Sequence, residues 1–440
     1  MASRSVTEQM GAAMRPELEL VLRCARTQFD PATTDRVRVL LRTDLNWPEV
    51  VEYAIRHRVT TMLYEGLAAM AADLISPSRQ QLLREKVQVS AKNSLILLRE
   101  MLRLYQLFEA AQIPVIPYKG PVLASLAYRS FARREYSDLD FALPQQYIPE
   151  ATAVLLAAGF SAGFDLREAH AGQHAFAPGQ YSFTLDKQCI PVELHTERTL
   201  RYFPVPLDFQ DLNRRMICVE IAGHSLRTFS VEDTLVMLCV HGAKHFWDRL
   251  AWIVDVAELI TVQPVDWALS MRIAAEAKST RVLLLGLYLA HNLLGASLPQ
   301  PVLERAQRDS AVRWLADKVG AQFEGNVDAG PGVIPRAIFR LRSRDGIGQG
   351  MRHTLRLAMS PTESDRQMMS LPRALTPLYV LMRPVRLLRE YGLGFRQRLK
   401  PTLVNHPKPQ EVVEDLPTKG PAPNSADVPA EPSKKDRSKA

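Results

Sequence analysis

Two carboxylates one residue apart are the side chains with the clearest chemical potential in this sequence. Asp138 and Asp140 occur in the run Ser-Asp-Leu-Asp-Phe-Ala-Leu, whose alternation of polar and apolar residues is typical of a strand. Alternate side chains of a strand share a face, so both acids are expected to point the same way. Such a pair repels itself unless a cation lies between the two groups. A hard divalent cation such as Mg²⁺ prefers oxygen ligands, so this strand is a candidate metal site.

The segment before these acids predicts a strand, a tight turn and a helix that would position them. Ile113–Tyr118 is a short apolar run, as expected of a buried strand. Lys119-Gly120-Pro121 follows, with a glycine for the turn and a proline suited to the first helical turn. The apolar residues of Val122–Tyr128 then recur with helical spacing. On the residues alone, this is either a plain strand-to-helix turn or the start of an anion-binding helix.

A family resemblance favours the second interpretation. The pattern Lys-Gly-x-x-Leu-Ala, followed by Arg-x-x-Ser-Asp-x-Asp, resembles the nucleotidyltransferase superfamily that includes polymerase beta and the antibiotic nucleotidyltransferases. More narrowly, it is similar to a bacterial family of uncharacterised nucleotidyltransferase-like proteins, often associated with surface-polysaccharide loci. The superfamily usually has Gly-Ser at the turn, whereas this chain has Lys119-Gly120-Pro121, a form that the narrower family shares. The similarity runs from about residue 17 to 300 and more weakly to 395.

The resemblance implies a role for each position. The turn would cradle nucleotide phosphates, the Asp-x-Asp strand would hold Mg²⁺ or Mn²⁺, and a later strand would add a third carboxylate. That acid would be Glu193, followed by His195 on the same face of the run Cys189–His195. Glu193 would bind metal or accept a proton, although the hairpin predicted over residues 181–195 would also suit a surface carboxylate. The catalytic and metal-binding candidates are therefore Asp138, Asp140 and Glu193.

Several polar residues are candidates for substrate binding. Arg134 would pair with phosphate or with Asp138, and His195 would serve either as a hydrogen-bonding neighbour of the metal ligands or as a phosphate contact. His241 and His245 lie four residues apart and share a helical face. This spacing suits zinc, but no glutamate lies between them, and histidines packed in a core are the alternative. The full set is Lys119, Gly120, Arg134, Ser137, His195, His241, Lys244 and His245.

Composition and charge limit the class of protein. The chain has 440 residues, 47% of them apolar, and a net charge of +8. Its four cysteines are far apart in sequence, which argues against a zinc site or a disulfide scaffold and favours buried free thiols. The N-terminus lacks the apolar core of a signal peptide, and no apolar run is long enough to span a bilayer. We therefore expect a cytoplasmic protein.

We expect an α+β fold, with a small mixed sheet of the nucleotidyltransferase type between N-terminal and C-terminal helical regions. Pro191 in the last predicted strand suggests that this strand lies at an edge or is paired on one side. Asp255, in the pattern Leu-x-Trp-x-x-Asp, is expected to contact residues that line the cleft rather than the substrate itself. The predicted regions are a leader (1–16), a helical region (17–110), the nucleotidyltransferase core (111–215), a helical domain completing the cleft (216–335), a basic helical region (336–400) and a disordered tail (401–440).

The basic region has properties of its own. Residues 336–400 contain 14 Lys or Arg against 4 Asp or Glu. Within them, residues 375–399 mix Leu, Tyr and Phe with arginines, a pattern that suits peripheral contact with an anionic membrane. Packing of this segment on the helical domain is the other interpretation. No nucleic-acid-binding motif accompanies the arginines, so no specific nucleic-acid partner is expected.

Together these features predict metal-dependent transfer of a nucleoside monophosphate from an NTP to the hydroxyl of a sugar, a small molecule or a protein. The alternative is a module that keeps the fold and binds nucleotides or partners without catalysis.

Overall fold

The computed structural model describes residues 14–164, 179–186, 188–196, 209–324, 333–346, 348, 350–351, 378–380 and 382. All of them lie within one compact unit, Met1–Phe395. The tail predicted to be disordered, 401–440, lies outside the described residues, as do most of 352–400 and the first part of the leader.

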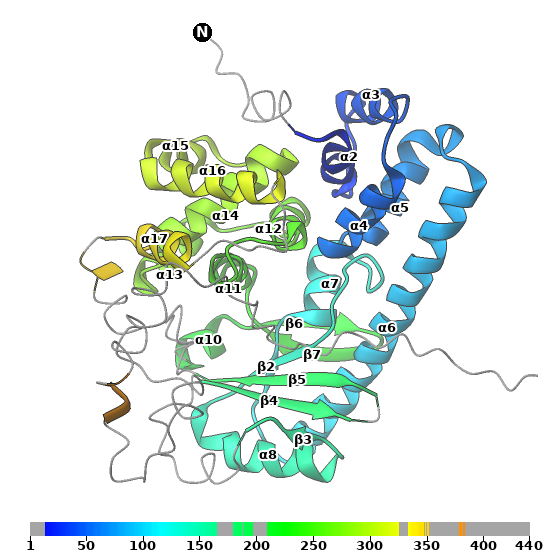
Figure 1. The fold of residues 1–440 in the computed structure, drawn as a ribbon. Helices are drawn as coiled ribbons and strands as arrows, with labels where there is room; N and C mark the ends of the chain where they lie inside the picture. Colours follow the sequence, from blue (N-terminus) through cyan, green and yellow to red (C-terminus); the bar gives the residue numbers. More distant parts are fainter. Residues whose placement is uncertain are drawn as a thin grey trace, which may run out of the picture. The chain divides into compact units, whose positions relative to one another are not determined.

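The N-terminal region is helical, as predicted. Its last helix, α6, runs for 34 residues and passes alongside the sheet (Figure 1). Ser76 caps α6 through its hydroxyl, which accepts from Arg79 N, and Pro77 occupies the first turn. The elements are α2 (Pro16–Cys24), α3 (Pro31–Leu40), α4 (Trp47–Arg56), α5 (Thr60–Ala71), the short 3₁₀ helix η1 (Ala72–Leu74) and α6 (Pro77–Ala110).

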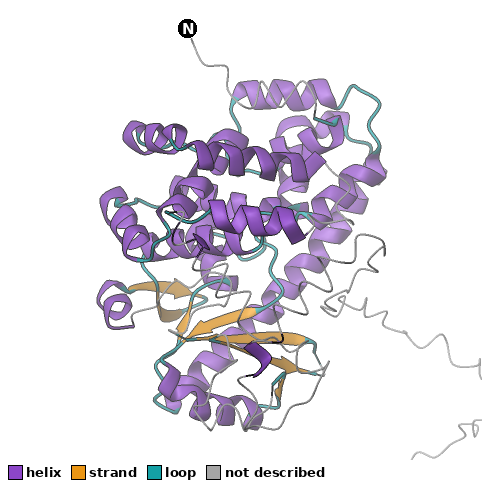
Figure 2. Cartoon of the chain, turned by 60° about the vertical axis from the view of Figure 1, so that its left-hand side comes forward, coloured by secondary structure: helices purple, strands orange, loops and turns teal. Residues whose placement is uncertain are grey.

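A mixed five-stranded sheet forms the centre of the next region (Figure 2). Its strands are β1 (Ile116–Pro117), β2 (Leu139–Ala142), β3 (Ser161–Ala162), β4 (Gln180–Leu185) and β5 (Ile190–His195), in the order β1-β2-β5-β4-β3. The β2–β5 pair is parallel, and the other three pairs are antiparallel. The predicted hairpin of β4 and β5 is confirmed, whereas the first strand is shorter than the predicted range Ile113–Tyr118.

One side of the sheet packs on helices. Leu139, Phe141 and Leu194 are almost completely buried in the main core, and Phe141 meets Phe108 of α6 with ring centroids 5.5 Å apart. Helices α7 (Gly120–Tyr128), η2 (Gln145–Tyr147) and α8 (Ile148–Ala157) connect the strands. The alternation that predicts core and functional faces for β2 is therefore confirmed on its apolar side.

The prediction from Pro191 is wrong, because β5 lies in the middle of the sheet. Pro191 pairs with Thr184 of β4, but pairing with β2 begins one residue later, at Val192. The proline therefore precedes the β2 ladder, and its missing N–H removes no bond from that side. Central strands tolerate proline at this position because only one neighbour has begun to pair.

A second sheet interrupts the region 216–335, which was expected to be helical. Helix α10 (Phe209–Arg215) precedes a two-stranded hairpin of β6 (Ile217–Ile221) and β7 (His224–Thr228). Its turn residues Ala222 and Gly223 have φ angles of 49° and 82°. Two consecutive positive φ angles produce a hairpin turn whose twist matches that of the strands.

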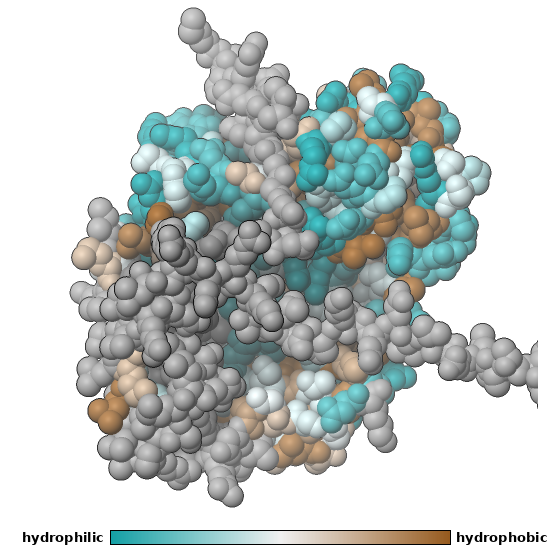
Figure 3. Space-filling view, viewed as in Figure 1, coloured by the Kyte–Doolittle hydropathy of each residue, from teal (hydrophilic) through white to brown (hydrophobic). Residues whose placement is uncertain are grey.

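The remaining described helices form the C-terminal part of the unit. They are α11 (Val231–Lys244), α12 (Leu250–Val262), α13 (Trp267–Glu276), α14 (Thr280–Leu294), α15 (Gln300–Arg308), α16 (Ser310–Glu324) and α17 (Val333–Arg342). On the face drawn in Figure 3, hydrophilic residues cover α15 and α16. Of the helices in the described ranges, none has both the length and the apolar character needed to cross a bilayer.

Candidate active site

The parallel pairing of β2 with β5 brings the predicted acids together. Asp140 lies directly opposite Glu193, and Ala142 lies opposite His195. Because the pairs Leu139–Val192 and Phe141–Leu194 point into the core, Asp140, Glu193 and His195 share the other face. The Asp-x-Asp and Glu-x-His patterns, which the sequence places on two separate strands, thus form one polar surface.

Asp140, Glu193 and His195 form a compact group that could hold a metal ion. Their ligand atoms all lie within 4.8 Å of one another. His195 Nε2 is 2.8 Å from Asp140 Oδ1 and 3.4 Å from Glu193 Oε2. The Asp140 side chain is 1% exposed and that of Glu193 is 26% exposed, so the group opens toward Glu193. Two carboxylates and an imidazole are a donor set that suits a divalent cation, with the oxygens favouring Mg²⁺ or Mn²⁺.

Positive groups of the chain compensate the charge of Asp140. Lys119 Nζ donates to Asp140 Oδ1 at 2.9 Å, the same oxygen that His195 contacts. Burial opposes ionisation of Asp140, but Lys119 and His195 outweigh it and hold the pKa of Asp140 well below its usual value. In the same way, burial would lower the pKa of His195, but its hydrogen bonds to Asp140 and Glu193 raise it. A cation held by these three residues would compete with the proton on His195.

The predicted turn places Lys119 at this position. Lys119 is the N-cap of α7, and Gly120, its first residue, has a φ of 47°. A Cβ atom at Gly120 would lie 3.3 Å from the carbonyl oxygen of Asp138. The turn therefore needs glycine both for its left-handed backbone and for the close approach of α7 to the start of β2. Contact of Lys119 and Gly120 with nucleotide phosphates stays a prediction.

Asp138 lies just before β2 and is partly buried. Burial and the neighbouring charge of Asp140 raise its pKa, whereas Lys119 opposes this shift. Asp138 is not part of the group of described residues that could hold a metal ion, so its role as a ligand stays a prediction. The adjacent Ser137 is exposed, and its Oγ accepts a hydrogen bond of 3.1 Å from Arg58.

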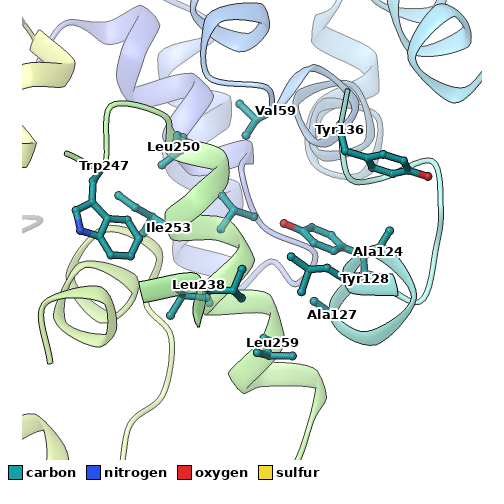
Figure 4. Close-up of a cluster of buried hydrophobic side chains, with 14 of the residues drawn as sticks. Val59, Ala124, Ala127, Tyr128, Tyr136, Leu238, Trp247, Leu250, Ile253 and Leu259 are labelled. Atoms are coloured by element: carbon teal, nitrogen blue, oxygen red, sulfur yellow. The ribbon is translucent and has the colours of Figure 1, made fainter. Parts of the chain in front are cut away.

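Arg134 forms its ion pair with Asp255, the acid expected to support the site. Its Nε and Nη2 donate to the two Asp255 oxygens at 2.8 and 3.0 Å. The Tyr128 hydroxyl donates to Asp255 Oδ1 at 2.7 Å, and Figure 4 shows this ring between α7 and α12. The alternative of an Arg134–Asp138 pair is therefore not what the structure shows. Nη1 of Arg134 is buried and has no hydrogen-bond partner among the described residues.

His241, Lys244 and His245 lie at the C-terminal end of α11, beside the acidic group. The two histidine rings are 4.7 Å apart, and both contact Trp252 of α12 at 5.3 and 5.0 Å. Burial, followed by the charge of Lys119, lowers the pKa of His241 well below its usual value. The same two causes lower the pKa of Lys244, while Glu193 and Asp140 oppose the shift. This end of α11 therefore lies within electrostatic reach of both Lys119 and the acids.

The glycine between these residues has a packing role. A Cβ atom at Gly242 would lie 2.5 Å from ring carbons of Trp247, which is completely buried. The turn after α11 carries Phe246 and Trp247, both with positive φ. Gly242 thus lets the indole pack against α11, and this contact fixes the turn that leads from Lys244 to α12.

Two arginines of the site escaped prediction. Arg58 lies in the turn between α4 and α5, and Arg249 is the N-cap of α12. The sequence carries one local signal for Arg58, a basic residue just after the end of a helical pattern, but such residues usually face solvent. Arg58 comes within electrostatic reach of Asp138, about 80 residues away, and of Arg249, about 190 residues away, so both proximities are tertiary.

Comparison with known proteins agrees with this geometry. The model of a family described as uncharacterised nucleotidyltransferase matches residues 43–295, which is 253 of the 440 residues. The chain belongs to this family. The matched range includes the sheet, α7, α11 and α12, and therefore every candidate residue named above. A search of the curated proteins and a search of the solved structures found no match.

The family match is confirmation of the resemblance and of the α+β fold. It starts after α3 and stops after α14. The similarity predicted for residues 17–42, and the weaker similarity predicted from about residue 300 to 395, lie outside the matched range.

Proposed function

We propose that this family member transfers a nucleoside monophosphate from an NTP to an acceptor hydroxyl and releases pyrophosphate. The observation that carries the proposal is the group of Asp140, Glu193 and His195, with ligand atoms within 4.8 Å, directly beside Lys119. Nucleotidyl transfer needs neutralised phosphate charge and aligned reactants more than covalent chemistry from the protein. Acids and bases concentrated on one face of a rigid strand pair meet that requirement.

Asp140, Glu193 and His195 would hold the divalent ion, with Asp138 next to them. When bound, Mg²⁺ or Mn²⁺ would neutralise charge on the phosphates and on the reacting oxygens. Lys119, on the same acid, and Lys244, within electrostatic reach of it, would bind the nucleotide phosphates. Glu193 is the more exposed carboxylate, so it is the one that an acceptor hydroxyl can approach as metal ligand or proton acceptor.

A non-catalytic nucleotide-binding module is the second candidate, and one observation favours it. Asp140 Oδ1 already accepts from Lys119 and contacts His195, so the acid is stabilised by the chain itself. A protein that binds nucleotide without turnover could keep Asp140 for this structural purpose. The two candidates differ in turnover and agree on nucleotide binding.

The experiment is a pyrophosphate-release assay with each NTP, with Mg²⁺ or Mn²⁺, and with or without a cell extract as the source of acceptor. We expect metal-dependent release by the native protein and its loss in Asp138→Asn and Asp140→Asn, which keep the side-chain shape and remove the charge. Melting curves check that both variants fold. Unchanged release by either folded variant would remove that residue from the catalytic site.

We further propose that the acceptor is a sugar, a small molecule or a protein side chain, as in surface-polysaccharide assembly, and that residues 375–399 attach the protein weakly to anionic membrane. Most of this segment lies outside the described residues. Its five arginines support the proposal, since each basic residue near an anionic surface contributes ~1 kcal/mol. Vesicle co-sedimentation of the full chain and of a chain ending at Gly350 provides the test. Equal sedimentation of the two would contradict it.

A further inference from the structure

Arg58 occupies a backbone position that normally takes glycine. It follows the end of α4 with a φ of 54°. Arg58 N donates to Ile55 O at 3.1 Å, and Val59 N donates to Ala54 O at 2.9 Å. These two bonds define a Schellman motif with Arg58 at the left-handed position, where glycine has no steric penalty. A strained arginine in a turn is an observation that calls for a role of its side chain.

The Arg58 side chain lies among charged groups of both signs. Its guanidinium donates to Ser137 Oγ at 3.1 Å. Burial, and then the charge of Arg249, lower its pKa to about 10; Asp138 opposes this and Arg134 adds to it. Asp248 also lies within electrostatic reach of Arg58 and Arg249. Nevertheless, in the described ranges neither arginine forms an ion pair with a carboxylate.

Other donors of the same region also lack an anionic partner. Nη1 of Arg134 is buried without a hydrogen bond to any described residue, although the other two guanidinium nitrogens hold Asp255. Lys244 is partly buried and within electrostatic reach of Asp138, Asp140 and Glu193, yet it pairs with none of them in the described structure. The site therefore has an acidic side, formed by Asp138, Asp140 and Glu193, and a cationic side on which some nitrogen donors form no bond to a carboxylate of the described residues.

A helix contact holds the cationic side in place. His57 is completely buried, and its Nδ1 accepts from Leu250 N at 3.3 Å, while its carbonyl oxygen accepts from Ala251 N at 3.1 Å. His57 thus caps the start of α12, and Figure 4 shows Val59 and Leu250 in one apolar cluster. The residues next to these anchors are Arg58 and Arg249. Their backbones are fixed relative to each other before any ligand arrives.

We propose that Arg58 and Arg249 bind the β- and γ-phosphates of the nucleotide, the part that leaves as pyrophosphate, while the carboxylates face the α-phosphate. The inference rests on the proposed function for the identity of the ligand and extends it to the helical region. Arginine suits this role because its planar group donates two parallel hydrogen bonds to phosphate oxygens. The chemical class recognised by this side is a polyphosphate.

The test is the substitution Arg58→Gly, matched with Arg129→Gly. Both residues have left-handed backbones, with φ of 54° and 51°, but Arg129 is exposed at the end of α7. Glycine removes the steric strain of the left-handed backbone in both variants, so both should melt at or above the melting temperature of the native protein. Calorimetry with inorganic tripolyphosphate, without divalent cation, and with each NTP measures binding. Arg58→Gly should raise the Kd at least tenfold, and Arg129→Gly should change it less than twofold.

The outcomes separate this inference from the proposed function. Native-like tripolyphosphate affinity in folded Arg58→Gly, or no tripolyphosphate binding by the native protein, overturns the inference. If the native protein binds tripolyphosphate through Arg58 but releases no pyrophosphate from any NTP, the inference stands and catalysis does not. If Arg58→Gly keeps both the native kcat and the native KM for NTP, catalysis stands and the inference falls. Arg58→Lys should recover part of the affinity, since it restores charge without the planar group.

Discussion

At the scale of single residues, the site depends on carboxylates that differ in their surroundings. Asp140 is buried and bound by Lys119 and His195, whereas Glu193 is partly exposed and contacts His195 alone among the described residues of this group. Burial opposes ionisation of Glu193, but His195 holds the pKa of Glu193 below its usual value. Glu193 is therefore charged at neutral pH and accessible.

We expect Glu193→Gln to bind NTP with nearly native affinity but to lose at least about 10²-fold in turnover, the low end of general-base contributions. The amide keeps the shape and removes the charge. Calorimetry and the pyrophosphate assay measure the two effects. The control is Glu220→Gln, another strand carboxylate, which is exposed on β6. A near-native rate in Glu193→Gln would make Glu193 a surface carboxylate.

His57 predicts a pH dependence of stability. Burial lowers the pKa of His57 from 6.5 to about 4, and the charges of Arg56 and Arg249 add to the shift. The unfolded chain binds a proton at His57 more readily than the folded chain does. The contribution of neutral His57 to the free energy of unfolding is therefore complete above pH 6.5 and is lost as the pH falls toward 4. The loss is at most about 3 kcal/mol. In His57→Asn, the amide Oδ1 can replace Nδ1 as the hydrogen-bond acceptor. The free energy of unfolding of this variant, measured by denaturation between pH 7 and 5, should depend less on pH than that of the native protein. An identical pH dependence would contradict this account.

At the scale of elements, the turn between α11 and α12 controls the position of Lys244 and Trp252. Gly242→Ala would force a Cβ atom against the fully buried Trp247. We expect a loss of about 1–3 kcal/mol in unfolding free energy, as for other overpacked cores. Gly346→Ala is the control, because nothing lies within 4 Å of the added atom there. Equal melting temperatures of the two variants would show that the turn adapts.

Alternation was sufficient to predict that Asp140 points away from Leu139 and Phe141 in β2, and that Glu193 and His195 share one face of β5. The sequence did not predict that the two strands pair in parallel, because register depends on neighbours far along the chain. The prediction that Pro191 marks an edge strand was wrong for the same reason, since β2, one of the two neighbours of β5 in the sheet, is far along the chain. The hairpin β6–β7 was missed, although the alternation of Ile217–Ile221 and the Ala222-Gly223 turn are local signals for it.

Tertiary contacts account for what else could not be predicted. Arg134 pairs with Asp255, 121 residues away, and Leu250 N reaches His57 across 193 residues. No periodicity encodes such contacts. The pattern Leu-x-Trp-x-x-Asp did point to α12, and the structure explains it through the contacts of Trp252 and Asp255.

At the scale of the whole molecule, the site joins three parts of the chain. The sheet provides the acids, α11 and α12 provide Lys244 and Arg249, and the N-terminal helical region provides Arg58. The loop before β2 links them, because Glu135 accepts from the backbone of Thr60 and Thr61 at the start of α5. The small sheet alone would therefore lack its cationic side, which agrees with a family match that begins before the sheet and ends beyond α12.

Nucleotidyl transfer is tested most directly by a measurement that follows labelled phosphate from NTP to product. The protein is incubated with Mg²⁺ or Mn²⁺, cell extract and NTP labelled either at the α- or at the γ-phosphate, with Asp140→Asn as the matched control. We predict that the α-label enters an acceptor fraction, that the γ-label leaves as pyrophosphate, and that the folded variant does neither. Transfer of the γ-label to the acceptor, or equal transfer by the variant, would contradict the account.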